Sequence, residues 1–213
     1  IAYAIGRIGC QVSGDGDWGI SNSAYTSDES GKVQIATPGQ FRMQLEKNKT
    51  YFLEGKVTDT AGKMIYVTDR VYPSLDEVPQ KSFKGPSFLP DWFFAYAYPQ
   101  NVNKDGILMP GITDEHNRVL PLPVFPTPLY ETLLCSIIFL ILWFIRKSIS
   151  TPLVMFGIYL LLNGIERFLI ELIRVNKLYP VMGFNLSQAE MIALLLSLTG
   201  LILIVFARKP KTG

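Results

Sequence analysis

The stretch TPLVMFGIYLLLNGIERFLIELIR, residues 151–174, has the length of a membrane-spanning helix but carries charges that lipid cannot surround. A helix of roughly 20 apolar residues crosses a bilayer. Five polar or charged side chains occupy its second half: Asn163, Glu166, Arg167, Glu171 and Arg174. At about 100° per residue, four of them fall within an arc of about 80° on one helix face, with only Glu166 beside it. Each charge at bilayer depth costs on the order of 3 kcal/mol unless paired or hydrated, so we expect this face to line a protein cavity.

Two interpretations of that charged face compete. Arg167 and Glu171 are spaced i, i+4 and can pair, so they could form an ion pair that only locks the helices together. Alternatively, the planar donor fork of Arg167 binds a phosphate, and Glu171 fixes the fork. Arg7, in AIGRIGCQVSGDGDWGI at residues 4–20, offers a similar choice between an interfacial anchor and a second anion ligand.

Two further apolar runs have membrane-spanning length: LYETLLCSIIFLILWFIRK at residues 129–147 and AEMIALLLSLTGLILIVFARKPK at residues 189–211. The basic residues that end them mark the cytoplasmic side: Arg146, Lys147, Arg208, Lys209 and Lys211. The sequence before residue 126 is then expected outside the membrane. Arg7 and Arg167 both lie toward that outer side, which suggests that they bind a phospholipid headgroup.

These patterns predict a mainly α-helical polytopic membrane protein with a small β-containing extramembrane insert. Residues 1–20 would form the end of a membrane helix and a signature loop, 21–125 the insert, and 126–213 three transmembrane helices with a cytoplasmic C-terminus. Within the insert, residues 32–72 alternate apolar and polar side chains between turn signals, which predicts two to four antiparallel strands. The aromatic residues of 88–102 could form a small core or pack at the lipid headgroups, and we favour the headgroups.

Composition excludes several classes of function. A formal charge of +2 over 213 residues argues against a nucleic-acid surface. The two cysteines, Cys10 and Cys135, give no disulfide framework, and His116 is the single histidine, so we expect no zinc site. The chain begins at Ile1 within an apolar stretch, which we interpret as the start of a fragment or of a product trimmed upstream.

Four blocks, in order, resemble the prolipoprotein diacylglyceryl transferase family: GRIGCQVSGDGDWG at 6–19, FPTPLYE at 125–131, NGIERFLIELIR at 163–174 and SQAEMI at 187–192. The resemblance implies transfer of the diacylglyceryl group from phosphatidylglycerol to the lipobox cysteine thiol of a prolipoprotein, with release of glycerol phosphate. It also implies a multi-pass protein of the bacterial inner membrane, with seven helices and a periplasmic head. The partners would be phosphatidylglycerol, other membrane lipid and the prolipoprotein signal peptide, with no nucleic acid, metal or organic cofactor.

The same resemblance assigns the site residues. Its catalytic residues would be Arg7, Arg167 and Glu171. Its substrate-binding residues would be Arg7, Gly9, Cys10, Gly14, Asp15, Gly19, Tyr130, Asn163, Arg167 and Arg174. The histidine proposed as the base of the family lies in a segment upstream of Ile1. We therefore expect residues 1–213 alone to be inactive.

Two other classes of function remain as alternatives. A non-catalytic structural or binding membrane protein, in which the charges only lock helices, predicts tolerance of Arg167→Lys. A transporter fragment would also carry intramembrane ion pairs. Transporters favour inverted repeats or broken helices, and the sequence shows no internal repeat.

Overall fold

The structure, a computed structural model, describes residues 1–175, 178–181 and 184–207. The chain divides into two compact units. The first, called the helical unit, comprises Ile1–Ile8 and Leu129–Gly213; the second, called the insert unit, comprises Gly9–Pro128. The basic residues on which part of the topology prediction rests, Arg208, Lys209 and Lys211, lie outside the described residues.

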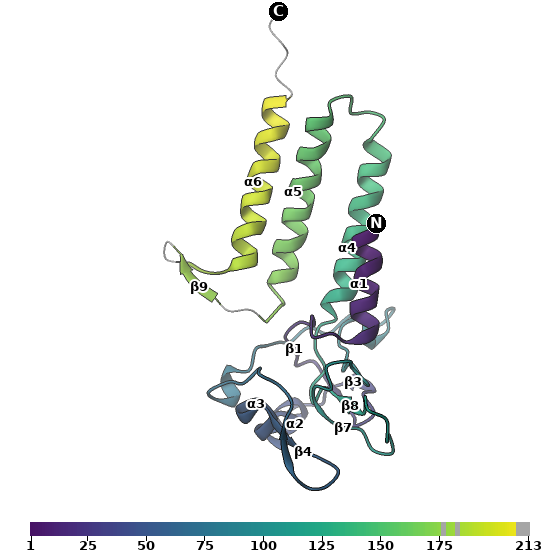
Figure 1. Ribbon diagram of the computed structural model, residues 1–213, viewed down its shortest axis with the longest axis vertical. Helices are drawn as coiled ribbons and strands as arrows, with labels where there is room; N and C mark the ends of the chain where they lie inside the picture. The colour runs from purple at the N-terminus through teal and green to yellow at the C-terminus, as the bar shows by residue number, and fades with distance from the viewer. Residues whose placement is uncertain (176–177, 182–183, 208–213) are drawn as a thin grey trace, which may run out of the picture. The chain divides into compact units, whose positions relative to one another are not determined.

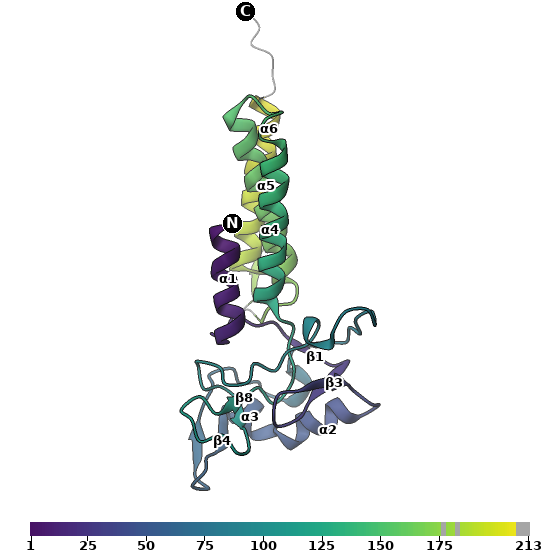
Figure 2. The same ribbon diagram turned by 90° about the vertical axis from the view of Figure 1, so that its right-hand side faces the viewer.

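Three long helices build the helical unit: α4 (Thr127–Ile145), α5 (Pro152–Glu171) and α6 (Gln188–Ala207). They run side by side, and each is long and apolar enough to cross a membrane (Figures 1 and 2). Helix α1 (Ala2–Ser13) packs its first turns on α4, where Thr132 Oγ1 donates a hydrogen bond to Ala4 O at 3.3 Å. Helix α5 ends at Glu171, so Arg174 lies beyond the helix instead of on its predicted polar face.

Small residues let α5 and α6 approach closely. A Cβ atom built on Gly164 would lie 2.3 Å from Ser197 Oγ and 2.7 Å from Ala193 O. One built on Gly157 would lie 2.8 Å from Gly200 O. Without side chains at these positions the two backbones can touch, as in other membrane helix pairs. This contact sets the end of α5 beside the start of α6.

A short antiparallel pair of strands, β9 (Leu178–Val181) and β10 (Phe184–Ser187), leads into α6. Ser187 and Glu190 then form a capping box at the start of that helix. Ser187 N donates to Glu190 Oε2 at 2.7 Å, and Glu190 N donates to Ser187 Oγ at 3.1 Å. These two hydrogen bonds fix the first turn of α6.

The insert unit is made of short elements around several small apolar clusters. Its strands are β1 (Ser21–Asn22), β2 (Tyr25–Ser27), β3 (Val33–Ile35), β4 (Lys56–Thr58), β5 (Met64–Tyr66), β6 (Gln80–Lys81), β7 (Ile107–Leu108) and β8 (Arg118–Val119). Its helices are α2 (Gln40–Lys47), α3 (Lys49–Glu54) and the 3₁₀ turns Leu75–Glu77 and Asp91–Phe93. Strands β2–β3, β4–β5 and β7–β8 pair antiparallel, whereas β1–β6 pair parallel.

The strand prediction for residues 32–72 is only partly right. Strands β3, β4 and β5 do form there, but residues 40–54 between them are the helices α2 and α3. Phe41 and Leu45 are spaced i, i+4 and are both buried in one apolar cluster. That spacing is helical, and it decides the local structure over the shorter alternation of apolar and polar residues.

The interfacial prediction for residues 88–102 is wrong for its buried aromatics. Tyr98 packs with Trp18 in one core cluster of the insert unit, and Phe94 packs with Tyr25 in another. Phe88, in contrast, is largely exposed. These rings therefore supply much of the core of a unit that has little regular secondary structure.

Candidate functional site

Glu131 gathers three arginines inside the helical unit. It lies in the first turns of α4 and is fully buried, with 0% of its surface exposed. Its Oε2 contacts Arg7 Nε from α1, and its Oε1 lies 3.2 Å from Arg167 Nη1 on α5. Arg174 Nη1, three residues past the end of α5, is 3.8 Å from the same Oε1. One carboxylate thus holds guanidinium groups from three parts of the chain.

The three arginines differ in exposure, and the difference bears on function. The side chains of Arg7 and Arg174 are only 10% and 16% exposed, whereas that of Arg167 is 33% exposed. A guanidinium group carries five N–H donors in a planar fork. Because the described contact of Arg167 with Glu131 involves one nitrogen, the exposed part of the fork can reach a ligand.

Glu171 has a partner on another element. Ser187 Oγ donates a hydrogen bond of 2.8 Å to Glu171 Oε1, which ties the end of α5 to the residue before α6. The sequence pairs Arg167 with Glu171 by their spacing, whereas the structure gives Arg167 a partner on α4 and Glu171 a partner beside α6. Glu171 therefore fixes the wall of the site near Arg167.

A polar pocket of about 410 Å³ opens at these residues. It is lined by Arg167, Glu171, Arg174, Tyr179, Ser187, Gln188, Ala189 and Ile192. Two arginines and the beginning of α6 face it, and backbone N–H groups at a helix start also favour negative charge. The pocket therefore suits an anion with several acceptor oxygens.

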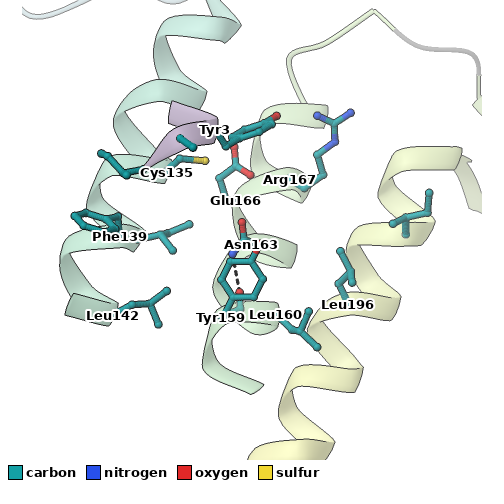
Figure 3. Close-up of a pocket in the computed structure, with 14 residues that line it drawn as sticks. Tyr3, Cys135, Phe139, Leu142, Tyr159, Leu160, Asn163, Glu166, Arg167 and Leu196 are labelled. Atoms are coloured by element: carbon teal, nitrogen blue, oxygen red, sulfur yellow. Dashed lines mark hydrogen bonds between the residues drawn. The ribbon is translucent and has the colours of Figure 1, made fainter. Parts of the chain in front are cut away.

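Figure 3 shows a second, apolar pocket of about 700 Å³. Arg167 and Ile192 line both pockets. The remaining lining comes from α1, α4, α5 and α6: Ile1, Ala2, Tyr3, Cys135, Ile138, Phe139, Leu142, Tyr159, Leu160, Asn163, Glu166 and Leu196. Its size is typical of a small-ligand site. Together, the two pockets offer a charged compartment and an apolar compartment that share one arginine.

Of two further predicted residues, Asn163 on α5 lines a pocket, whereas Tyr130 on α4 is absent from the described lining of both pockets. Asn163 lines the apolar pocket, where its Nδ2 donates to Tyr159 O at 2.8 Å (Figure 3). Tyr130 is half-buried and directly precedes Glu131 on α4. The structure thus gathers Arg7, Arg167 and Arg174 around one carboxylate and sets Asn163 in the neighbouring pocket.

The predicted glycines belong to the insert unit, and the backbone of Gly14 has a clear structural need for glycine. Gly14 has φ +62°, and a Cβ atom there would lie 2.8 Å from Asn101 Cβ. Gly19 is buried, and its N–H donates to Phe125 O at 2.9 Å. Gly9, on α1, is exposed and has open space where a Cβ would stand. The signature loop, residues 14–19, is therefore held by contacts within its own unit.

Cys10, Asp15 and Asp17 bring three possible metal-ligand atoms within 4.8 Å of one another. Structural zinc sites use four ligands, chiefly thiolates and imidazoles. One thiol with two carboxylates, one of them from the exposed Asp15, does not fit that pattern. The expectation of a site without metal or organic cofactor stays a prediction.

Glu131 is the site residue that the sequence analysis missed. The available signal was a single acidic residue at the end of an otherwise apolar run, on the same predicted side as Arg7 and Arg167. Its role depends on contacts across three elements, which spacing along one helix does not reveal.

Membrane-length helices around a buried arginine cluster define a helical integral membrane protein. The family model described as prolipoprotein diacylglyceryl transferase matches residues 1–206, and the chain belongs to that family. The match confirms the resemblance drawn from the four sequence blocks. It assigns the chain to a family of membrane-integral transferases of lipoprotein biosynthesis, which act on lipid and prolipoprotein. No curated protein and no solved structure matches the chain.

Proposed function

We propose that the helical unit binds phosphatidylglycerol and transfers its diacylglyceryl group to the lipobox cysteine of a prolipoprotein. The observation that carries this proposal is Arg167, which lines both the polar and the apolar pocket. A phospholipid has its phosphate where its polar and apolar parts meet. With the phosphate at Arg167, the headgroup enters the polar pocket, and the glycerol backbone and first acyl carbons enter the apolar one.

The arginine cluster suits the chemistry of this transfer. The cysteine sulfur forms a bond to the terminal glyceryl carbon of the lipid, the bond from that carbon to the phosphate oxygen breaks, and glycerol phosphate leaves with the electron pair. Negative charge therefore grows on the phosphate oxygens. Fixed guanidinium donors stabilise such charge most effectively where water is excluded. Arg167 contacts the phosphate directly, Arg174 adds donors from the wall of the polar pocket, and Arg7 adds positive charge from the other side of Glu131.

Glu131 and Glu171 act as positioning residues in this proposal. Glu131 holds the three guanidinium groups together, and Glu171 fixes the adjoining wall through Ser187. Asn163 and Tyr130 complete the substrate contacts in the helical unit. The signature-loop residues Gly14, Asp15 and Gly19, with Gly9 and Cys10 before them, are proposed as further substrate contacts because they match the first family block.

We also propose that the protein lies in the bacterial inner membrane with the insert on the periplasmic side. Arg146 and Lys147, directly after α4, support this orientation. Arg146 also lies over the ring of Trp143 at 3.2 Å, an arrangement typical of an interfacial anchor. In a cysteine-free background, an impermeant thiol reagent should label a cysteine at exposed Ser82 in intact cells but not one at exposed Ser148. Labelling of Ser148 alone would reverse the orientation.

The activity is tested with the full-length protein in liposomes. Thioether formation on a lipobox peptide should occur with phosphatidylglycerol as donor, and glycerol phosphate should appear in equal amount. A peptide with serine in place of the lipobox cysteine is the matched control and should receive no lipid. If phosphatidylethanolamine serves equally well, the transferase assignment survives but the proposed donor is wrong. Transfer from neither lipid would favour the structural alternative.

A further inference from the structure

The signature loop, residues 14–19, is held by a part of the insert unit to which the proposed function gives no role. Arg70, beyond the end of β5, is half-buried and donates a hydrogen bond from Nη2 to Gly16 O. Its guanidinium group also lies over the ring of Trp18, 5.0 Å from the ring centroid. One side chain, 54 residues from Gly16 along the chain, thus contacts the loop at two points.

A second set of contacts comes from residues 98–104. Tyr98 Oη donates a hydrogen bond of 2.8 Å to Gln11 Oε1, in the last turn of α1. Val102 N donates to Ser13 O, at the end of the same helix, at 2.9 Å. These two hydrogen bonds fix the residues from which the signature loop begins.

The backbone of this second segment is strained. Tyr98, Gln100 and Lys104 have φ of +46°, +58° and +53°, in the left-handed region that non-glycine residues rarely adopt. They are the only non-glycine residues with positive φ in the described part of the chain. Such conformations persist where neighbouring contacts hold them, and they are concentrated at functional sites. Arg70 and residues 98–104 together are called the clamp.

The loop that the clamp holds presents one exposed carboxylate, that of Asp15. The backbone on either side of it is tightly packed. A Cβ atom built on Gly14 would lie 2.8 Å from Asn101 Cβ. One built on Gly16 would lie 2.7 Å from Asn103 Nδ2. A polar group on a fixed backbone loses less conformational entropy on binding than one on a mobile loop.

We propose that the clamp holds the signature loop in its substrate-binding conformation, an inference that rests on the proposed function. Its members are positioning residues, because they act on the substrate only through the loop. The clamp keeps the loop in the arrangement in which Asp15 meets the substrate, so substrate binding does not have to order the loop. The insert unit then contributes to substrate affinity.

This role predicts a specific kinetic pattern. When only a fraction of the enzyme has the competent loop conformation, the apparent dissociation constant of the substrate rises by the inverse of that fraction. Saturating substrate restores the competent conformation, so kcat recovers. A variant that is partly unfolded shows the opposite pattern, because the smaller number of active molecules lowers kcat and leaves KM unchanged.

The experiment uses Arg70→Gln in the full-length enzyme in liposomes. KM for at least one of the two substrates, phosphatidylglycerol or the lipobox peptide, should rise at least about fivefold, with kcat within about twofold of the wild type. Tyr98→Phe, which removes one hydroxyl group of the clamp, should raise the same KM by a smaller factor. Arg42→Gln is the matched control. Arg42 is an exposed arginine of the insert unit that also forms ion pairs, and its replacement should change neither constant.

Hydrogen exchange tests the clamp without any enzymatic activity. In Arg70→Gln, the amides of residues 14–19 should exchange at least about tenfold faster, whereas those of β2 and β3 should exchange as in the wild type. If thermal unfolding in detergent shows that Arg70→Gln does not fold, Tyr98→Phe takes its place. Unchanged exchange of the loop, or unchanged KM for both substrates, would overturn the inference. If the loop responds as expected but the wild-type enzyme transfers no lipid, the proposed function fails instead.

Discussion

The two units both bury polar and charged side chains, but they satisfy them in different ways. In the insert unit, Tyr51 Oη donates to Asp105 Oδ1 at 2.7 Å, and Arg118 Nη1 donates to Gly106 O at 3.0 Å. Asn101 Oδ1 accepts a hydrogen bond from Asp105 N at 2.9 Å. These bonds link loop segments to one another within the core. In the helical unit, three arginines share the carboxylate of Glu131 beside two pockets.

This difference separates structural burial from burial that serves a ligand. A buried polar group that is bonded to its neighbours fixes the fold and needs nothing from outside. Arg167 and Glu166, in contrast, keep donor or acceptor capacity at the wall of a pocket. Unused bonding capacity alone does not identify the site, because Thr26 Oγ1, Ser27 Oγ and Gln44 Oε1 of the insert unit are also buried without a hydrogen-bond partner among the described residues. The site is identified by unused capacity at the wall of a pocket.

The largest effect should come from breaking the centre of the arginine cluster. Glu131→Gln keeps the shape of the side chain but removes the charge that holds three guanidinium groups together. We expect transfer to fall at least about a hundredfold, roughly 2.7 kcal/mol in the barrier. Asp105→Asn, the equivalent change in the insert unit, should leave transfer within about twofold. Similar losses in both variants would show that the comparison between the units is mistaken.

The next effect concerns the planar fork of the arginines. Lysine keeps the positive charge but loses the paired donors that match a phosphate. Arg7→Lys and Arg167→Lys should therefore each reduce transfer at least about tenfold, or roughly 1.4 kcal/mol in the barrier, with the protein still folded. Arg146→Lys, at the other end of α4, is the control and should retain activity. Full activity of Arg7→Lys would make Arg7 only an anchor.

The smallest effect is on the stability of the insert unit. Burial raises the pKa of Asp105, against the lowering effect of the Tyr51 hydrogen bond. Between its usual pKa and this raised pKa the folded state binds more protons than the unfolded state, so stability falls as pH rises through that window. Asp105→Asn should remove this dependence. Hydrogen exchange of residues 101–120, corrected for the intrinsic effect of pH, measures it; an unchanged dependence would contradict the assignment to Asp105.

The amino-acid sequence predicted the long helices and the two arginines on which the site depends. Runs of apolar residues report membrane-length helices directly, and charges within them stand out because lipid excludes them. Arg7 and Arg167 both contact Glu131 in the structure. The partner itself was missed because Glu131, at the edge of its apolar run, has no unusual neighbour along the chain.

Sequence patterns predicted the structure less well where a short segment fits both a strand and a helix. Residues 40–54 show both an alternating and a helical apolar pattern, and the burial of Phe41 with Leu45 decides for helices. Glu166 was placed just outside the charged arc of α5. Only the arrangement of α1 and α4 shows that it lines the apolar pocket. The helices at residues 40–54 and the position of Glu166 both depend on tertiary packing. A pattern read over a short stretch of sequence does not reveal that packing.

The central claim is that the arginine cluster binds the phosphate of the lipid. The most direct test removes the negative charge of the phosphate and the positive charge of Arg167, separately and together. Transfer from phosphatidylglycerol is compared with transfer from its neutral phosphate methyl ester, using the wild-type enzyme and Arg167→Gln. If Arg167 binds the phosphate, the wild-type preference for the anionic donor should exceed that of the variant at least tenfold. An equal preference in both enzymes would show that Arg167 does not interact with the phosphate charge, and it would contradict the account.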